Sequence, residues 1–338
     1  MKQVWIVKRG GPEVFEIREA PDPEPGAGEV RIRVAAAGIN FADLLTRLGI
    51  YPGAPPLPAV PGFEVAGEID RLGAGVDGLD VGERVGAMTR FGGYGSMVTV
   101  PADAVFRIPD GLSFEKAAAI PVNYATAWFM LVYLGNVRRS ERVLVHAAAG
   151  GVGQAAVQIC RWRGAEIVGS ASPSKHERLR QAGVAHCIDS SRSRFHDEVL
   201  RVTAGKGVDI ALDAVGGKSA RESYRCLAPL GRLFLFGLSS FAPGKRRRPL
   251  AVIRGMWTTP RFKPLDLISK NRGVFGFHLG CLEGNAGVAR EVMGEILARV
   301  ADGTFEPVVD RTFSFEEAGA AHDYIHSRRS FGKVLLVP

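Results

Sequence analysis

The spacing of hydrophobic residues changes character about a third of the way along the chain. Residues 1–109 carry short runs of alternating or continuous apolar positions separated by clusters of glycine and proline, a pattern typical of β-strands. The expected strands are Val4–Lys8, Val14–Arg18, Glu29–Ala36, Val65–Leu72, Arg84–Ala87 and Ser96–Val100. This part of the chain therefore predicts a compact, mostly β domain.

After Ser113 the pattern predicts helices and strands in alternation, which is typical of a parallel, doubly wound sheet with helices on both faces. Helical spacing covers Phe114–Pro121, Tyr124–Leu134, Val152–Arg163 and Lys175–Ala182, and strand-like runs cover Arg142–Val145, Glu166–Ser170, Val208–Asp213, Arg232–Phe236 and Gly273–Leu279. The chain then closes with a helix over Val288–Asp302 and a β–helix–β segment over Val308–Phe313, Phe315–Ser327 and Lys333–Val337.

These patterns predict an α/β protein with one split domain around an inserted domain. We expect the inserted, Rossmann-type dinucleotide-binding domain over residues 123–280, and the mostly β domain over residues 1–122 and 281–338. A chain of 338 residues is long enough for two domains with ample cores.

A buried strand runs into a glycine turn at Arg142–Gly153, and helical spacing follows it. A nucleotide pyrophosphate needs bare backbone N–H groups at a helix N-terminus, which small residues allow it to approach. The turn is therefore predicted to bind the cofactor through Ala148, Gly150, Gly151, Val152 and Gly153, with alanine at the first glycine position. An ordinary strand-to-helix turn is the alternative.

The end of the next strand indicates which dinucleotide binds. An NAD site places Asp or Glu there, but this chain has Ala171, followed by Ser172, Ser174 and Lys175. Two hydroxyls and a lysine can receive a 2′-phosphate, so we predict NADPH with Ser172 and Lys175 as ligands. The serines can also cap a helix that begins at Pro173, and the two roles are compatible.

Charge and cysteine content narrow the class of protein. Part of the net charge of +8 is concentrated in residues 245–272, which begin with Lys245-Arg-Arg-Arg248. No nucleic-acid-binding motif accompanies it, so we expect no nucleic-acid partner; weak contact with an anionic membrane surface and a solvated loop both stay open. Four scattered cysteines, and the lack of a signal-peptide or transmembrane pattern, predict a cytoplasmic protein with reduced thiols.

Several motifs in order resemble the medium-chain dehydrogenase/reductase superfamily, in its zinc-free quinone oxidoreductase (zeta-crystallin-like) branch. They are Ala37–Asp43, Val60–Gly67, Gly92–Ser96, Pro121–Thr126 and His146–Gly153. Within that branch, Ser170–Glu177, Gly276–Gly280 and Phe331–Pro338 resemble the vesicle amine transport protein 1 homologues. The resemblance covers nearly the whole chain and implies a GroES-like catalytic domain around the Rossmann domain.

The resemblance also implies that no metal is bound. Zinc-dependent relatives use a Cys where Asn40 stands, a His where Phe63 stands and a further Cys near Val122, and neither Asn40 nor Phe63 supplies thiolate or imidazole. Without a Lewis acid, alcohol oxidation is disfavoured. A quinone or an α,β-unsaturated carbonyl is then the better hydride acceptor, because a conjugated system spreads the charge that develops.

The candidate site residues follow from these motifs. Asn40, Asp43 and Tyr51 are expected to orient the substrate, with Tyr94 as a further candidate. The expected cofactor contacts beyond the glycine turn are Asn40, Tyr124, Thr126, Phe236, Gly237, Ser239, Phe275, Phe277, Arg328 and Lys333. The resemblance implies that Arg328 lies near the adenosine phosphate. Helix capping by Asn40 and Asp43, a turn role for Tyr51, helix packing of Tyr124 and Thr126, and a solvated Arg328 are the alternatives. His146 and His278 are interpreted as core histidines.

We therefore predict an NADPH-dependent reductase of quinones or enones. Enoyl-thioester reduction, and an NADPH-binding interaction or membrane-associated protein, are the alternatives. The apolar run Gly273–Leu279 is also predicted to be the edge strand through which a homodimer extends its sheet, unless residues 245–271 fold over that edge.

Overall fold

The computed structural model describes residues 1–191, 194–246, 248–282 and 285–338. The chain forms two compact units. The first comprises Met1–Ala125, Gly244–Arg247 and Gly280–Pro338, and the second comprises Thr126–Pro243 and Arg248–Leu279. The two ends of the chain thus share one unit.

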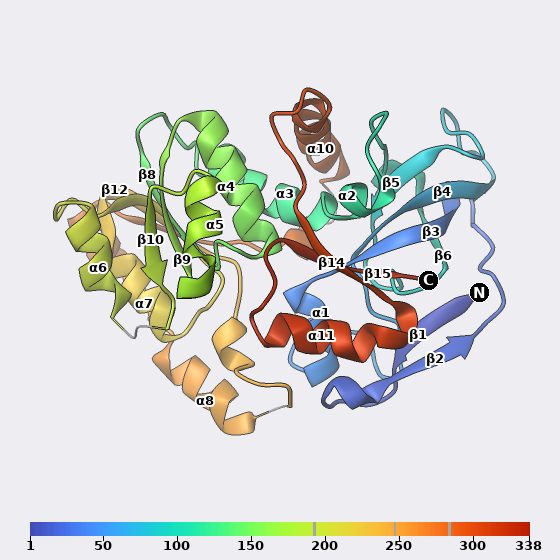
Figure 1. Ribbon diagram of the computed structural model, residues 1–338, viewed down its shortest axis with the longest axis horizontal. Coiled ribbons are helices and arrows are strands. Elements are labelled where there is room, and N and C mark those ends of the chain that lie inside the picture. The colour runs from blue at the N-terminus through green and yellow to red at the C-terminus, as the bar shows by residue number, and fades with distance from the viewer. Residues whose placement is uncertain (192–193, 247, 283–284) are drawn as a thin grey trace. The chain divides into compact units, whose positions relative to one another are not determined.

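The first unit is built on a seven-stranded, mainly antiparallel sheet (Figure 1). Its path runs β14 (Val309–Ser314), β15 (Lys333–Val337), β3 (Glu29–Ile39), β4 (Glu64–Leu72), β5 (Arg84–Met88) and β7 (Val105–Arg107), and β6 (Met97–Pro101) also pairs with β3. A separate pair is formed by β1 (Lys2–Ile6) and β2 (Phe15–Glu19). The helices are α1 (Phe41–Leu48), α2 (Phe114–Ala118), α10 (Ala286–Ala301) and α11 (Ala318–His326).

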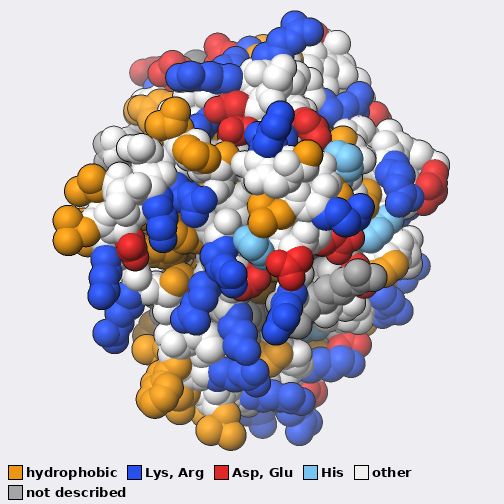
Figure 2. Space-filling view, turned by 90° about the vertical axis from the view of Figure 1, so that its left-hand side faces the viewer, with side chains coloured by type: hydrophobic (Ala, Val, Ile, Leu, Met, Phe, Trp, Pro, Cys, Tyr) orange, Lys and Arg blue, Asp and Glu red, His pale blue; other side chains and the backbone are white. Residues whose placement is uncertain are grey.

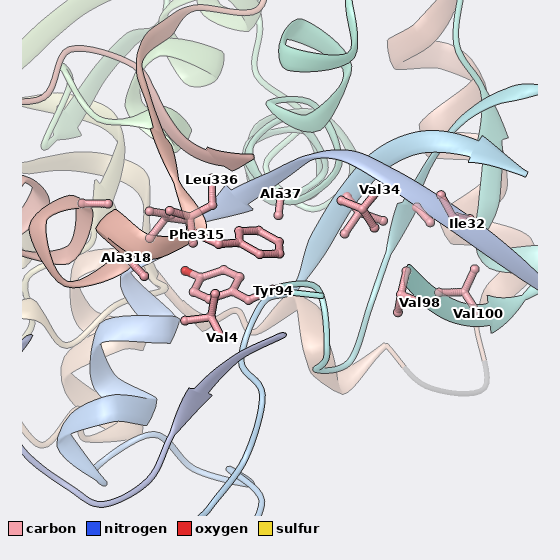
Figure 3. Close-up of a cluster of buried hydrophobic side chains, with 14 of the residues drawn as sticks. Val4, Ile32, Val34, Ala37, Tyr94, Val98, Val100, Phe315, Ala318 and Leu336 are labelled. Carbon is pink, nitrogen blue, oxygen red and sulfur yellow. The ribbon is translucent and has the colours of Figure 1, made fainter. Parts of the chain in front are cut away.

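The core of this unit is shared by both ends of the chain. Figure 3 shows Val4 and Ile32 from the N-terminal part in one cluster with Phe315 and Leu336 from the C-terminal part, all nearly or fully buried. The β15–β3 pairing joins the same two parts through backbone hydrogen bonds. Because neither part can bury this apolar surface alone, we expect them to fold as one unit.

The second unit is a six-stranded, wholly parallel sheet. Its order is β10 (His186–Asp189), β9 (Glu166–Ala171), β8 (Arg142–His146), β11 (Val208–Asp213), β12 (Leu227–Leu235) and β13 (Gly273–Gly276). The helices are α4 (Gly151–Arg163), α5 (His176–Gln181), α6 (Phe195–Val202), α7 (Lys218–Arg225), α8 (Pro249–Thr258) and α9 (Pro264–Lys270), while α3 (Pro121–Trp128) leads in from the first unit. The strand order reverses between β8 and β11, where such sheets bind ligands outside the carboxyl ends of the strands.

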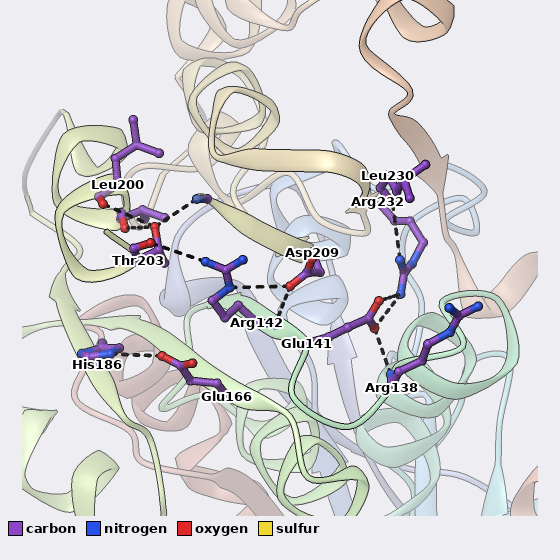
Figure 4. A network of polar contacts seen from close by, with 12 residues as sticks. Arg138, Glu141, Arg142, Glu166, His186, Leu200, Thr203, Asp209, Leu230 and Arg232 are labelled. Carbon is purple, nitrogen blue, oxygen red and sulfur yellow. Dashed lines mark hydrogen bonds and ion pairs between the residues drawn. The ribbon is translucent and has the colours of Figure 1, made fainter. Parts of the chain in front are cut away.

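The opposite, amino edge of this sheet is closed by polar contacts between neighbouring connections (Figure 4). The backbone N–H of Arg142 donates to Asp209 at 2.7 Å, and Glu141 pairs with Arg232 at 2.8 Å. Further along, His186 Nε2 lies 3.2 Å from a carboxylate oxygen of Glu166. These side chains pair with one another at the amino edge of the sheet. The ligand is expected at the opposite, carboxyl edge.

The structure corrects several sequence predictions in the second unit. The last strand ends at Gly276 rather than Leu279, so His278 is exposed and the interpretation of it as a core histidine is wrong. The expected helix Tyr124–Leu134 divides into α3 and a π-helical turn at Phe129–Tyr133. Residues 248–272 hold α8 and α9 rather than a plain loop, while Arg247 of the basic run lies outside the described residues.

No helix in the described ranges has the length and apolarity that crossing a bilayer requires.

Candidate cofactor and substrate sites

The glycine turn after β8 leads into α4 with no side chain capping the helix. Gly150 is the N-cap residue and accepts only the backbone N–H of Gln154, at 2.8 Å. The Gln154 side chain instead donates to the Ala148 carbonyl at 2.9 Å, and the Ala148 N–H donates to Ser170 of β9 at 3.1 Å. The first turn of a 13-residue helix is thus presented without a side-chain acceptor, as an anion-binding N-terminus requires.

The two outer glycines of this turn are required for different reasons. A Cβ at Gly153 would lie 2.2 Å from the Ala147 carbonyl oxygen, so the fold itself demands glycine there. A Cβ at Gly150 would meet only that oxygen, at 3.3 Å, and the backbone of Gly150 (φ −81°, ψ 176°) suits any residue. Packing explains Gly153 but not Gly150. A pyrophosphate that approaches the backbone from outside would explain the glycine at position 150. The turn therefore fits the pyrophosphate of a dinucleotide cofactor.

The end of β9 brings two hydroxyls together. Ser172 and Ser174 have their oxygens 3.4 Å apart, and Ser172 makes no side-chain cap to the short helical turn that follows. The structure also places Asp189, the last residue of β10, in register with Ala171. Sequence reasoning missed this carboxylate because it comes from a strand it did not predict. Ser191 occupies one of its oxygens, through its backbone N–H at 2.9 Å and its hydroxyl at 2.7 Å.

A buried polar cluster lies where the strand order reverses. Asp213, at the end of β11, accepts the N–H groups of Val215 and Gly216 at 2.8 Å and the hydroxyl of Ser223 at 2.7 Å. The Ser223 hydroxyl lies 2.9 Å from Nε2 of His146, whose pKa burial lowers, so the ring is neutral and acts structurally, in agreement with the core-histidine interpretation. Sequence reasoning missed Asp213, although a carboxylate that ends a buried strand is a recognisable signal.

The turn held by Asp213 supports the next expected cofactor segment. Phe236 N–H donates to the Asp213 carbonyl and Ser239 N–H to the Ala214 carbonyl, at 3.1 and 3.2 Å. A Cβ at Gly237 would lie 2.5 Å from the same Ala214 oxygen. The segment 236–239 is therefore fixed at the carboxyl edge of the sheet, the edge that the prediction requires. Phe277 differs, because its N–H is used by the Leu235 carbonyl at 2.9 Å.

Asn40 and Asp43 begin α1 in the first unit, and their roles differ. Asn40 is the N-cap residue, and the Asp43 side chain, three residues later, completes a capping box: its carboxylate accepts the N–H of Asn40 at 2.7 Å and that of Gly62 at 2.9 Å. It is fully buried, and desolvation raises its pKa to about 7, against the opposing effect of these N–H groups. Asp43 therefore shapes the loop and does not reach a substrate, which corrects its predicted orienting role.

The Asn40 side chain takes part in a different set of contacts. Its amide nitrogen donates to Glu64 at 2.8 Å, and its oxygen accepts from the ammonium of Lys333 at 2.7 Å. Lys333, on β15, is 2% exposed and also pairs with Glu64. The prediction that Lys333 contacts the cofactor is therefore wrong, because its charge is already bound inside the first unit. Glu64, the third residue of this buried cluster, was not identified from the sequence.

Aromatic side chains gather after α1 and before β4. The Tyr51 ring meets Phe63 edge-on with centroids 5.4 Å apart, and Phe63 packs against Phe91 at 5.1 Å. Burial, with a smaller effect of Asp43, raises the pKa of Tyr51 to about 12, so its hydroxyl stays a donor at neutral pH. This half-buried aromatic group can accommodate a flat, conjugated substrate.

The remaining candidates are placed as follows. Tyr94 is fully buried, with its hydroxyl 3.2 Å from His322, so it cannot contact a substrate. Tyr124 is buried against Phe305, as the helix-packing alternative has it, and Thr126 is buried on the same helix. Arg328 is exposed where α11 ends. The Phe275 ring is partly exposed on β13 and stacks on Phe234 at 4.9 Å. Within the described residues, no three or more His, Cys, Asp or Glu side chains are gathered so as to hold a metal ion.

Comparison with known proteins finds two matching family models. The alcohol dehydrogenase GroES-like domain matches residues 26–110, and the zinc-binding dehydrogenase model matches residues 182–336. The human synaptic vesicle membrane protein VAT-1 homolog is 41% identical over 96% of this chain and 82% of its own length.

Solved structures agree with this relationship. The Escherichia coli quinone oxidoreductase complexed with NADPH is 28% identical, with a TM-score of 0.88 and complete coverage of both chains. The CurK enoyl reductase is 30% identical, with a TM-score of 0.86 over 99% of this chain and 98% of its own.

Proposed function

The chain belongs to the medium-chain dehydrogenase/reductase superfamily, and from that premise we propose that it is an NADPH-dependent reductase of quinones or α,β-unsaturated carbonyls that works without zinc. The observation that carries the proposal is the uncapped N-terminus of α4 behind Gly150, at the position where the sheet reverses its strand order. When bound, the nicotinamide cofactor supplies a hydride.

The preference for NADPH rests on the end of β9. Ala171 brings no carboxylate to the ribose position, and Ser172 and Ser174 bring two neighbouring hydroxyls. The charge of Asp189 opposes this assignment, but Ser191 already satisfies one of its oxygens. A solved relative that is complexed with NADPH supports the same choice.

The substrate class rests on side chains of the first unit. Asn40 can donate an N–H to a carbonyl oxygen, and Tyr51 can donate its phenolic proton or stack on a ring. Phe63 stands where zinc-dependent relatives place a histidine, and Asn40 where they place a cysteine, so the chain offers hydrogen bonds in place of a Lewis acid. Such donors stabilise an oxygen that gains negative charge as the double bond is reduced, and solvent supplies the proton that completes the product.

Two other functions have observations in their favour. Likeness to the CurK enoyl reductase favours an enoyl-thioester substrate, which undergoes the same reduction. Exposed apolar side chains on α8 and α9 favour weak binding to an anionic membrane: Leu250, Ile253, Met256, Trp257, Leu265 and Ile268, beside Arg248, Arg254, Arg261, Lys263 and Lys270. Figure 2 looks at the left-hand side of the molecule as drawn in Figure 1, and hydrophobic and basic side chains lie together at the bottom of that view.

The direct test is a panel of quinones, enones and enoyl thioesters assayed with NADPH and with NADH. We expect turnover of a quinone or enone, with NADPH favoured. Turnover of thioesters alone would replace the proposal by the enoyl-thioester function. Tight NADPH binding without turnover of any member of the panel would favour the membrane-associated function instead.

A further inference from the structure

Three side chains from distant parts of the sequence meet inside the first unit: Asn40 before α1, Glu64 at the start of β4 and Lys333 at the start of β15. The Lys333 and Glu64 side chains are 2% and 0% exposed. Burying an ion pair gains little stability on balance, because desolvation of both charges offsets their attraction. A buried pair that holds a third, neutral side chain calls for an explanation beyond stability.

The pair leaves only one orientation for the Asn40 amide. An ammonium only donates hydrogen bonds, so the atom 2.7 Å from the Lys333 nitrogen must be the amide oxygen. A carboxylate only accepts, so the atom 2.8 Å from Glu64 must be the amide nitrogen. The oxygen of Asn40 is thereby bound, and one N–H is bound. The other contact of the amide nitrogen is a long one, 3.4 Å to the Gly38 carbonyl oxygen, so the second N–H is the group that a ligand can take over most easily.

The surrounding backbone is built to admit the pair. A Cβ at Gly38 would lie 2.6 Å from Glu64 Oε1 and 2.7 Å from Lys333 Cε, so only glycine leaves room for them. The second oxygen of Glu64 accepts the backbone N–H of Val122 at 2.7 Å, which fixes the carboxylate against the first turn of α3. Glu64 is therefore held from two sides and cannot rotate away from Asn40.

We propose that Lys333 and Glu64 are positioning residues which turn Asn40 into a fixed, polarised N–H donor for the substrate's carbonyl oxygen, with the buried ammonium supplying the positive charge. A cation bound to the amide oxygen draws electron density from the nitrogen and strengthens the remaining N–H as a donor.

This inference rests on the proposed function. When bound, the reduced nicotinamide would supply a hydride that forms a C–H bond at the β-carbon of an enone and would itself become oxidised, while the π electrons of the double bond would move onto the carbonyl oxygen. The second N–H of Asn40 would exchange its long contact with the Gly38 carbonyl for one with the enolate oxygen, and so stabilise that oxygen. A proton from water then forms the second C–H bond, so that two electrons and two hydrogens have been added.

The first measurement needs no turnover and no variant of the cluster. The chain contains five asparagines, at positions 40, 123, 136, 271 and 285, so selective ¹⁵N labelling gives five side-chain amide signals. With the wild-type protein, saturating NADP⁺ and 2-cyclohexenone should shift one of the two Asn40 amide protons downfield while the other, bound to Glu64, stays in place. Unchanged Asn40 protons in a complex whose binding is shown by calorimetry would overturn the proposal.

The second measurement separates charge from structure. In Lys333→Met we expect the Asn40 ¹⁵N signal to shift and kcat for the enone to fall about tenfold or more, with the Kd for NADPH unchanged; Lys333→Arg should restore part of kcat. Lys116→Met, which removes an exposed, ion-paired lysine of the same unit, is the matched control and should change neither. A folded Lys333→Met protein with unaltered kcat and Asn40 signal contradicts the proposal.

Failure of the proposed function would look different. If the wild-type protein binds 2-cyclohexenone at Asn40 but reduces no carbonyl in the panel, the reductase proposal fails while the positioning role stands. If Lys333→Met does not fold, the wild-type titration and Lys333→Arg still decide the question, because the first reads the donor directly and the second keeps the buried charge.

Discussion

At the scale of single residues, the proposed reduction depends on which side chains can bind a metal, donate a hydrogen bond or bring a negative charge. Asn40 and Phe63 could be identified from the sequence as unable to bind zinc, and Ala171 as lacking a carboxylate. The contacts of Asn40 could not, because Glu64 and Lys333 are separated from it by 24 and 293 residues and meet it only when the sheet has formed. The family resemblance placed Lys333 near the cofactor, and burial in this cluster is the physical reason why that prediction is wrong.

The cofactor preference is tested by exchanging one residue at the end of β9. Ala171→Asp puts a carboxylate where a 2′-phosphate is expected, and charge repulsion should lower the affinity for NADPH relative to NADH by about tenfold or more. Asp189→Asn is the matched control. It removes a negative charge from the residue in register with Ala171, whereas Ala171→Asp adds one, so it should leave the NADPH preference unchanged or strengthen it. Equal or tighter NADPH binding by Ala171→Asp, measured by calorimetry, would refute the assignment.

The buried carboxyl group of Asp43 gives the protein a pH-dependent stability. Its pKa of about 7 lies well above that of an unfolded aspartate, so between about pH 4 and pH 7 the folded state holds a proton that the unfolded state has lost. This contribution is complete below about pH 4 and is lost as the pH rises to 7, with a slope of at most about 1.4 kcal/mol per pH unit.

Denaturant unfolding at intervals from pH 4.5 to 7.5 measures this slope. Asp43→Asn cannot titrate, so its free energy of unfolding should decline less steeply with pH than that of the wild type. A constant difference between the two proteins across this range would show that Asp43 is ionised throughout.

At the scale of elements, the strongly patterned segments were predictable and the short polar ones were not. The strands that flank the glycine turn and the helix α4 appear where the sequence places them, and Gly150 and Gly153 keep their expected places. The strand β10 and the helices α6 and α7 were missed, because β10 has four residues, α6 has only eight, and α7 carries few apolar positions. Asp189 and Ser223, which belong to β10 and α7, were missed with them.

The two glycines of the turn should respond differently to alanine. Gly153→Ala drives a Cβ into the Ala147 carbonyl and should lower the free energy of unfolding by a few kcal/mol. Gly150→Ala has an ordinary backbone conformation and a milder contact, so it should retain most of its stability but bind NADPH at least tenfold more weakly. Thermal unfolding and calorimetry measure the two effects. Gly150→Ala with unchanged NADPH affinity would mean that the turn is structural only.

At the scale of the whole molecule, the family resemblance and the α/β class with a GroES-like part are confirmed by the comparisons. Oligomeric state stays a prediction. The strand β13 is the last strand on its side of the parallel sheet, and Phe275 and Gly276 on it are exposed. An uncovered apolar edge supports pairing with a second copy, since a twofold contact would extend the sheet.

Light scattering tests this assembly. The wild-type protein should have about twice the chain mass of 36.2 kDa at micromolar concentration. Phe275→Lys should convert it to a monomer, whereas Val81→Lys, at an exposed apolar residue of the first unit, should leave the dimer intact. A wild-type monomer would instead favour the alternative in which residues 245–271 cover the edge.

The central claim is hydride transfer from NADPH to a conjugated carbonyl without a metal. The most direct measurement is to incubate the protein, after elemental analysis and in excess chelator, with an enone and NADPH deuterated at C4 of the nicotinamide, and to locate the label by mass spectrometry. We predict one deuterium at the β-carbon of the reduced product for each NADPH oxidised, and no stoichiometric zinc. Activity that disappears together with a bound zinc, or no label in any product while NADPH binds, would contradict the claim.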